Sequence, residues 1–264
     1  MSETTNPTLD LLLRRKSLRA YTDQPIPLEV KEQLLQSTLR APTAGNMTLY
    51  TIIDVQDQTL KDRLAVTCDD QPFIATAPLL LLFLADYQRW EDYYTACGVD
   101  ELCAQKGLER RRPQEGDLFL ACCDALIAAQ TAVTAAEALG LGSCYIGDII
   151  ENYETHRQIF DLPRYVFPIS LVCFGYPTEA QKNRPQPERF APQYIIHPNR
   201  YRRLDAAEFE EMYRSTHERV FAGRPQVGEA VNIGQFNYLR KFSAEFSHEM
   251  TRSVQAILKA WRGE

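Results

Sequence analysis

The most apolar stretch of the chain reads APLLLLFLA and runs from Ala77 to Ala85. This run is far too short to cross a bilayer, which needs about 20 apolar residues in a helix. A continuous apolar run of this length is typical of a strand that is covered on both of its faces. We therefore expect it to lie in a sheet with helices packed above and below.

Further strands and helices are predicted on both sides of this run. Other strands are expected from Tyr50 to Val55 and from Ile169 to Phe174. Helices are expected from Thr8 to Arg15, after Pro25-Ile26-Pro27, from Asp57 to Val66, from Asp205 to Arg219 and from Tyr238 to Trp261. The segment from Tyr87 to Pro113 is charged and aromatic, and it is predicted to be an irregular surface excursion. Strands mixed with helices without regular alternation indicate an α+β fold.

The strongest predicted helix runs from Asp117 to Leu139 and is rich in Ala and Leu. Apolar residues surround most of its circumference, which is typical of a helix buried in a large core or covered by a partner. For one domain of this size we expect this helix to contribute to a subunit interface.

Composition excludes several classes of protein. The chain has 264 residues, a net charge of −6 and a pI near 5.4, which argues against a general binder of nucleic acids or anionic membranes. The first residues are polar and carry no export signal, and the seven cysteines show no CxxC spacing, so we expect reduced thiols in the cytoplasm. His248-Glu249 could begin HExxH, but Arg252 stands at the second His position, so no metal site is predicted.

Two basic clusters lie at opposite ends of the sequence. The first is Arg14-Arg15-Lys16-Ser17-Leu18-Arg19, and the second is Lys182-Asn183-Arg184. Most short basic runs are simply solvated, but two that meet in the fold could grip a phosphate monoester, with bidentate guanidiniums and a lysine point charge.

The glycine segment Gly140-Leu141-Gly142-Ser143-Cys144-Tyr145 resembles a dinucleotide fingerprint only in part. It fails GxGxxG at Tyr145 and follows a helix instead of a strand, so a Rossmann site is rejected. Two interpretations remain: a glycine that ends the helix, or small residues that let backbone amides approach a flat ligand.

Two more segments could contribute polar groups to a site. The loop Ala41-Pro42-Thr43-Ala44-Gly45-Asn46 is either a plain connection or a source of amides, a hydroxyl and a carboxamide. Gln71 precedes the apolar run; it is either solvated or paired with the donor–acceptor edge of a heterocycle.

Taken in order, four of these motifs resemble the FMN-dependent nitroreductase family. They are Arg-x-Ser-x-Arg near the start, Ala-Pro-Thr-Ala-Gly-Asn, Gly-Leu-Gly-Ser-Cys-Tyr-Ile-Gly, and Lys-x-Arg past the last core strand. The likeness runs from about Leu11 to about Phe190 and is greater to the larger NADPH nitroreductase and flavin reductase branch. It implies a three-layer α+β fold, with a central, mainly antiparallel sheet flanked by helices, a C-terminal helical extension, and a homodimer. The chain would then be a single domain over residues 1–264, with a core of about 8–190 and an extension of about 191–264.

The resemblance also implies the residues of an FMN site, carried over position by position. Those at the phosphate and ribityl end would be Arg15, Lys16, Ser17, Arg19, Lys182 and Arg184. Those along the flavin ring would be Pro42, Thr43, Ala44 and Asn46, partly from the neighbouring subunit, with Gln71 at the pyrimidine edge and the amides of Leu141, Gly142 and Ser143 near N5 and O4. Many members continue the Asn with a Gln-Pro-Trp-like stretch, where this chain has Met47-Thr48-Leu49.

The activity implied by the resemblance is ping-pong electron transfer. NADH or NADPH would deliver hydride to flavin N5, and a nitroaromatic, a quinone or free flavin would then take the electrons. Because the flavin carries this chemistry, no catalytic side chain is predicted.

Two alternatives stay open: a non-catalytic flavin-binding sensor or storage protein, and a flavin-fragmenting or dehalogenating relative. Arg200, Arg202 and Arg203 are either a solvated run or a site for the nicotinamide nucleotide phosphate, and the sequence does not choose between NADPH and NADH.

Overall fold

The computed structural model of the protein describes residues 6–264. The chain divides into two compact units. The first holds residues 6–185 and 249–264, and the second holds residues 186–248.

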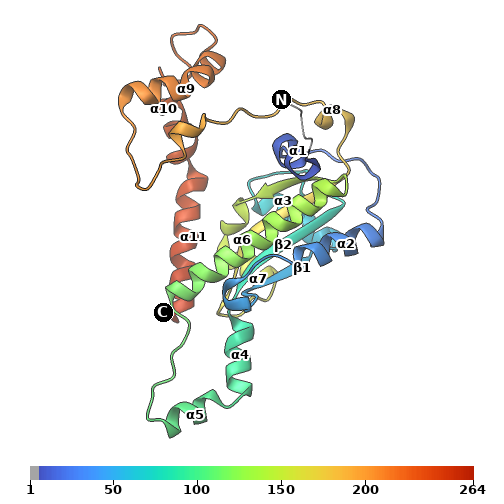
Figure 1. The fold of residues 1–264 in the computed structure, drawn as a ribbon, viewed down its shortest axis with the longest axis vertical. Coiled ribbons are helices and arrows are strands. Elements are labelled where there is room, and N and C mark those ends of the chain that lie inside the picture. The colour runs from blue at the N-terminus through green and yellow to red at the C-terminus, as the bar shows by residue number, and fades with distance from the viewer. Residues whose placement is uncertain (1–5) are drawn as a thin grey trace. The chain divides into compact units, whose positions relative to one another are not determined.

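The first unit is built around a four-stranded sheet (Figure 1). Its strands are β1 (Tyr50–Asp54), β2 (Leu79–Asp86), β3 (Gly142–Ile146) and β4 (Val166–Gly175), in the order β1-β2-β4-β3. Every adjacent pair is antiparallel, and β2 is buried along its whole length. The predicted α+β class with a mainly antiparallel sheet is therefore confirmed, and the apolar run at residues 77–85 forms, from Leu79 onward, a strand covered on both faces.

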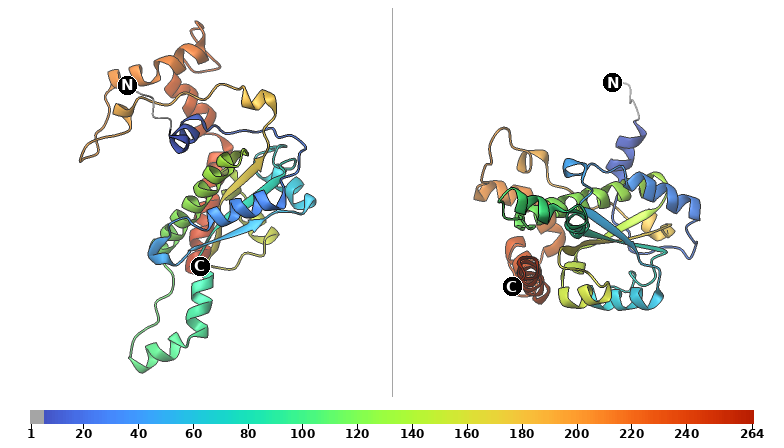
Figure 2. Two further views of the ribbon diagram at one scale, coloured as in Figure 1. Left: turned by 45° about the vertical axis from the view of Figure 1, so that its right-hand side comes forward. Right: turned by 90° about the horizontal axis from the view of Figure 1, so that it is seen from below.

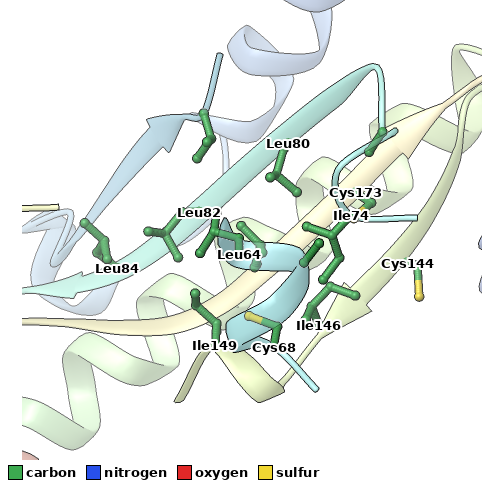
Figure 3. Close-up of a cluster of buried hydrophobic side chains, with 14 of the residues drawn as sticks. Leu64, Cys68, Ile74, Leu80, Leu82, Leu84, Cys144, Ile146, Ile149 and Cys173 are labelled. Atoms are coloured by element: carbon green, nitrogen blue, oxygen red, sulfur yellow. The ribbon is translucent and has the colours of Figure 1, made fainter. Parts of the chain in front are cut away.

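Helices cover both faces of the sheet (Figures 1 and 2). On one face, α2 (Leu28–Thr38) and α6 (Glu115–Ala138) pack on Leu79, Leu81 and Phe83 of β2. On the other face, α3 (Gln58–Thr67) and the 3₁₀ turn η2 (Asp148–Ile150) pack on Leu80, Leu82 and Leu84 (Figure 3). Alternate side chains of one strand thus enter two separate cores, as the period of two in a strand requires.

The remaining elements are shorter or lie near the ends of the chain. They are α1 (Pro7–Arg14), η1 (Ala44–Asn46), α4 (Gln88–Ala96), α5 (Val99–Gln105), α7 (Tyr153–Ile159), α8 (Glu179–Lys182), η3 (Pro192–Tyr194), α9 (Ala206–Phe221), α10 (Ile233–Asn237), the π-helix η4 (Tyr238–Phe242) and α11 (Glu245–Arg262). In the second unit, Phe221, Ala230 and Ile233 form a small core of their own.

Helix α6 has the length and apolar composition of a membrane span. Its packing explains that composition, because Leu118, Ala121, Ala125 and Ala128 are buried in the first unit. The prediction of an apolar circumference also holds for the outer side, where Phe119 is 70% exposed and other large apolar side chains are exposed with it.

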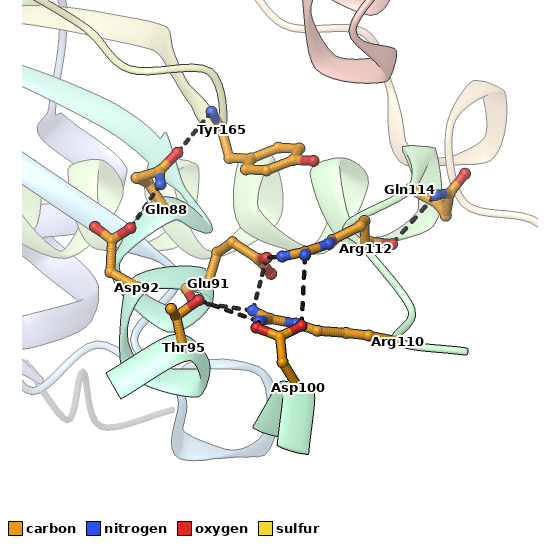
Figure 4. A network of polar contacts seen from close by, with 9 residues as sticks. All are labelled: Gln88, Glu91, Asp92, Thr95, Asp100, Arg110, Arg112, Gln114 and Tyr165. Atoms are coloured by element: carbon orange, nitrogen blue, oxygen red, sulfur yellow. Dashed lines mark hydrogen bonds and ion pairs between the residues drawn. The ribbon is translucent and has the colours of Figure 1, made fainter. Parts of the chain in front are cut away.

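The prediction of an irregular surface excursion at residues 87–113 is wrong in part, because this segment contains helices α4 and α5. Arg110 joins the two helices by ion pairs to Glu91 of α4 and Asp100 of α5 (Figure 4). Arg112 pairs with the same Glu91 carboxylate, which is buried. The charged side chains that favoured a loop prediction therefore pair with one another in the folded structure.

The prediction of one continuous helix from Tyr238 to Trp261 is also wrong. It is interrupted at Ser243, whose hydroxyl donates to the carbonyl of Tyr238, and α11 begins only at Glu245. The part of α11 from Glu249 onward belongs to the first unit, where Ile257 and Trp261 enter a core with Tyr165.

Replacing Trp261 with alanine should destabilise the first unit by about 3–5 kcal/mol, the usual cost of deleting a buried aromatic side chain. Trp261 is 1% exposed, meets Tyr165 edge-on and donates its indole N–H to the carbonyl of Gln114. Urea unfolding would measure the loss. Val254→Ala on the same helix is the control, since Val254 is 38% exposed and should change stability little.

Candidate functional site

The N-terminal segment Ser17–Thr22 crosses the end of the sheet where β3 begins and β4 ends. The amide of Leu18 donates to the carbonyl of Ser143 at 2.9 Å, and the amide of Thr22 donates to the carbonyl of Tyr176 at 2.8 Å. The hydroxyl of Tyr21 donates to the carbonyl of Leu18 at 2.8 Å. The segment is therefore fixed to the ends of two strands that lie more than 120 residues further along the chain.

Two glycines that face each other in the sheet make this crossing possible. Gly142 of β3 is the register partner of Gly175 of β4. A Cβ on Gly142 would lie 2.5 Å from Cδ1 of Leu18, and a Cβ on Gly175 would lie 2.7 Å from Cγ of Tyr21. Both contacts are closer than atoms can approach, so a side chain at Gly142 would force the Leu18 side chain to move, and one at Gly175 would displace the Tyr21 ring.

The crossing brings the two basic clusters together. Lys16 Nζ donates to the carbonyl of Lys182 at 2.6 Å and also to that of Arg184. In return, an Nη of Arg184 donates to the carbonyl of Ser17 at 2.9 Å. The backbone amide of Arg19 donates to the side chain of Gln181 at 3.2 Å. Each cluster thus holds the backbone of the other, and the cationic groups gather at the start of β3.

These cations have few carboxylate partners. Within residues 6–264, Lys182 pairs with Glu179, whereas Lys16, Arg19 and Arg184 have no carboxylate within 4.0 Å. Burial raises the pKa of the Cys144 thiol on β3, and the positive charges of Arg19, Arg184 and Arg15 oppose that rise. Burial likewise raises the pKa of Glu137 near the end of α6, against the charges of Arg15, Arg14 and Lys16. We name these five residues, Arg15, Lys16, Arg19, Lys182 and Arg184, the cation cluster.

A buried hydroxyl lies on the same strand. Ser143 is 1% exposed, and its Oγ has no hydrogen-bond partner among the described residues. An unpaired buried hydroxyl costs free energy unless a ligand or water completes it. Excess positive charge beside an unsatisfied hydroxyl is the chemistry that a phosphate monoester on a hydroxylated chain would match.

The amides predicted near a flavin ring are not all available. Gly140 has φ +77° and ends α6, and the amide of Leu141 donates back to the carbonyl of Ala136 at 2.8 Å. Gly142 belongs to the ladder with β4, because the carbonyl of its neighbour Ser143 faces outward to Leu18. Of the three residues, Ser143 directs its backbone groups away from β4, toward the N-terminal segment that bridges it at Ser17. The contacts of Leu141, Gly142 and Ser143 with a flavin stay a prediction.

The loop containing Pro42, Thr43, Ala44 and Asn46 lies away from the cation cluster. It leads into β1, whose first residue Tyr50 pairs with Ala85 at the far end of β2. The cluster lies beyond the other end of β2, where Leu79 pairs with Phe174. Six residue steps separate the two ends, a distance of about 20 Å, so one chain alone does not bring the loop to the cluster.

Asp124 of α6 fixes this loop, and the sequence analysis missed it. Its carboxylate accepts from the amide of Ala44 at 2.9 Å and from that of Leu49 at 3.0 Å, and the residue is buried. A lone aspartate inside an alanine-rich helix was the available signal, since a buried carboxylate needs donors.

Gln71 lies near the opposite end of β3 from the cluster. Its Nε2 donates to the carbonyl of Cys68 and to Asp148 Oδ2, both at 2.8 Å. Asp148 follows β3, which spans four residue steps or about 13 Å. Because both amide hydrogens are used, Gln71 offers a ligand only its Oε1 acceptor.

Several acidic residues lie around this end of β3. Glu151 is buried and its Oε1 has no partner among residues 6–264. Burial raises its pKa to about 7, and the charges of Asp148, Asp69 and Glu249 add to the rise. Glu151 therefore holds a proton in the folded protein at pH values where an exposed glutamate has lost it.

Glu151→Gln should abolish a loss of stability that the wild-type protein shows as pH rises. The folded pKa lies above the ordinary value of 4.5, so the folded state binds more protons than the unfolded state between about pH 4.5 and 7, and stability falls across that window. Urea unfolding of both proteins at several pH values would measure the difference. Glu154→Gln is the control: Arg252 lowers the pKa of Glu154, so Glu154 does not cause the loss and this variant should still show it.

Comparisons with known proteins agree with this architecture. The profile of the nitroreductase family matches residues 12–176. The FMN reductase [NAD(P)H] of Bacillus subtilis is 32% identical over 200 residues, which are 76% of each chain. The oxygen-insensitive NADPH nitroreductase of Salmonella typhimurium is 30% identical over 76% of this chain and 77% of its own. The structure of NfrA2 from B. megaterium superposes with a TM-score of 0.76 at 25% identity, covering 97% of this chain and 98% of that one. The chain belongs to the nitroreductase family.

Proposed function

We propose that the protein binds FMN and passes electrons from NADH or NADPH to small acceptors such as nitroaromatics, quinones or free flavin. The observation that carries this proposal is the cation cluster, which gathers positive charge from both ends of the sequence at one edge of the sheet. The two curated relatives named above are an FMN reductase and an NADPH nitroreductase, which supports the same activity.

The residues present fit FMN at its phosphate end. Arg15, Arg19, Lys182 and Arg184 would neutralise the phosphate, with Ser17 beside them and the unpaired Ser143 hydroxyl directed to a phosphate or ribityl oxygen. The Lys16 ammonium donates two hydrogen bonds to backbone carbonyls and has one donor left, so its main role would be to position the cluster. When bound, FMN supplies the two-electron chemistry between nicotinamide and acceptor.

At the other end of β3, Gln71 Oε1 would accept the N3–H of the flavin ring. Asp148 holds the Gln71 side chain by accepting one of its amide hydrogens, and this fixes where the oxygen points. The cluster and Gln71 lie at the two ends of β3, as the phosphate and ring of one FMN lie at the two ends of that molecule. The strand would thus determine the direction in which the cofactor lies.

The complete site would need a homodimer. The loop with Pro42, Thr43, Ala44 and Asn46 lies about 20 Å from the cluster in its own chain, by strand geometry, so it would reach the flavin of the neighbouring subunit. The exposed apolar residues Phe119, Leu120 and Leu126 of α6 would be covered in the same contact. The seven cysteines are all free, which favours the reducing cytoplasm as the location.

Purified protein supplied with FMN should turn yellow and oxidise NADH or NADPH when a nitroaromatic or a quinone is present. Each nicotinamide would be tested against a small panel of acceptors in steady state, and parallel lines in double-reciprocal plots would indicate a ping-pong order. A protein that stays colourless and oxidises no nicotinamide would contradict the proposal. Flavin retention without turnover would identify a flavin-binding sensor or storage protein instead.

Replacing Arg15 and Arg184 together with alanine should weaken FMN binding roughly a hundredfold or more, because each charge-assisted contact contributes about 1.5–3 kcal/mol. Fluorescence titration with FMN and with riboflavin would separate the causes. Riboflavin lacks the phosphate, so its affinity should change little. An equal loss for both ligands would indicate general disruption, and Lys106→Ala on the exposed end of α5 is the matched charge control.

A further inference from the structure

A polar cavity opens at the same end of the sheet as the cation cluster, at the other edge. It has a volume of about 630 Å³ and lies where β1 ends and β2 begins, with Thr22, Lys31, Asp54 and Lys61 among its lining residues. Three strand spacings separate β1 from β3 in the sheet order, about 14 Å. The cavity is therefore distinct from the cation cluster, and all its lining residues belong to the first unit.

The feature that singles out this cavity is a buried ammonium without a counter-charge. Lys61 on α3 is 8% exposed. Its Nζ donates to the carbonyl of Ala77 at 3.0 Å, and no carboxylate lies within 4.0 Å of it in residues 6–264. Burial raises the pKa of the nearby Cys173 thiol, and the positive charge of Lys61 opposes that rise, so the charge lies beside the apolar core.

The other charges of the cavity do not neutralise Lys61. Asp54 pairs with Lys31 and also accepts from Gln56. Asp23 is exposed at the surface, where water screens it. A buried cation is costly unless an opposite charge accompanies it, and Lys61 has two donors to spare.

A second unsatisfied group belongs to a residue that lines the same cavity. The hydroxyl of Thr22 is buried and has no hydrogen-bond partner among the described residues. An ammonium with free donors and an unpaired hydroxyl together match an oxyanion, which accepts hydrogen bonds from both. The carboxylates of Asp23 and Asp54 would repel a large, highly charged ligand such as a nucleotide polyphosphate.

We propose that this cavity binds a small oxyanion, a carboxylate or a phosphate group, between the Lys61 ammonium and the Thr22 hydroxyl. The site is separate from the flavin site and its occupation does not depend on the proposed oxidoreductase activity. Thr22 is the last residue of the segment that crosses the sheet, so the bound anion would add a fixed point to that segment.

The test is titration of the full chain, with FMN present in excess so that the cation cluster is filled, using sodium phosphate, acetate and succinate at constant ionic strength. Calorimetry and thermal unfolding would report binding. At least one anion should bind the wild-type protein saturably and raise its Tm. Binding of phosphate alone or of the carboxylates alone would identify the preferred group.

Lys61→Met should weaken the binding at least roughly tenfold, since a charge-assisted hydrogen bond is lost, and Thr22→Val should weaken it less. Without anion, the Met variant should be at least as stable as the wild type, because an uncompensated buried charge is removed. Lys61→Arg keeps the charge and should retain binding, and Lys106→Met is the control. Absence of saturable binding to the wild type, or equal binding to wild type and Lys61→Met, would overturn the proposal.

Discussion

The candidate site depends on the contact between the N-terminal segment Ser17–Thr22 and the glycine pair of the sheet. Gly142 and Gly175 are register partners, and the absence of their side chains leaves the space that Leu18 and Tyr21 occupy. A side chain at Gly175 would displace the Tyr21 ring, and one at Gly142 would displace the Leu18 side chain. Either shift would disturb the N-terminal segment, whose backbone carries the bonds between the two basic clusters.

The cation cluster is assembled by hydrogen bonds between like-charged side chains and backbone carbonyls. Lys16 donates to the carbonyls of residues 182 and 184, and Arg184 donates to that of Ser17. These bonds fix the geometry but do not reduce the positive charge. The repulsion therefore remains in the folded chain, and the free energy that an anion would gain there is large because the geometry is already in place.

The sequence predicted those features that depend on local patterns, namely the covered strand β2, the long helix α6 and the two basic clusters. The sequence was a poor guide where contacts between distant segments determine the local structure. Helices α4 and α5 were not predicted, because the ion pair between Glu91 and Arg110 is visible only in the folded structure. The bond from the Leu141 amide to the carbonyl of Ala136, which ends α6, could not be distinguished in the sequence from a loop that binds a ligand. The roles of Asp124 and Lys61 depend on partners 75 and 16 residues away.

Helix α6 connects the two parts of the site that one chain keeps apart. Its inner side carries Asp124, which fixes the loop of Ala44 and Leu49, and its outer side exposes Phe119. If two copies pair through this outer side, the helix that forms the contact also determines where each loop lies. Pairing and completion of the flavin site would then be one event, because a rigid helix cannot satisfy one requirement without the other. The apolar composition of α6 would then have two causes, a core on one side and a partner on the other.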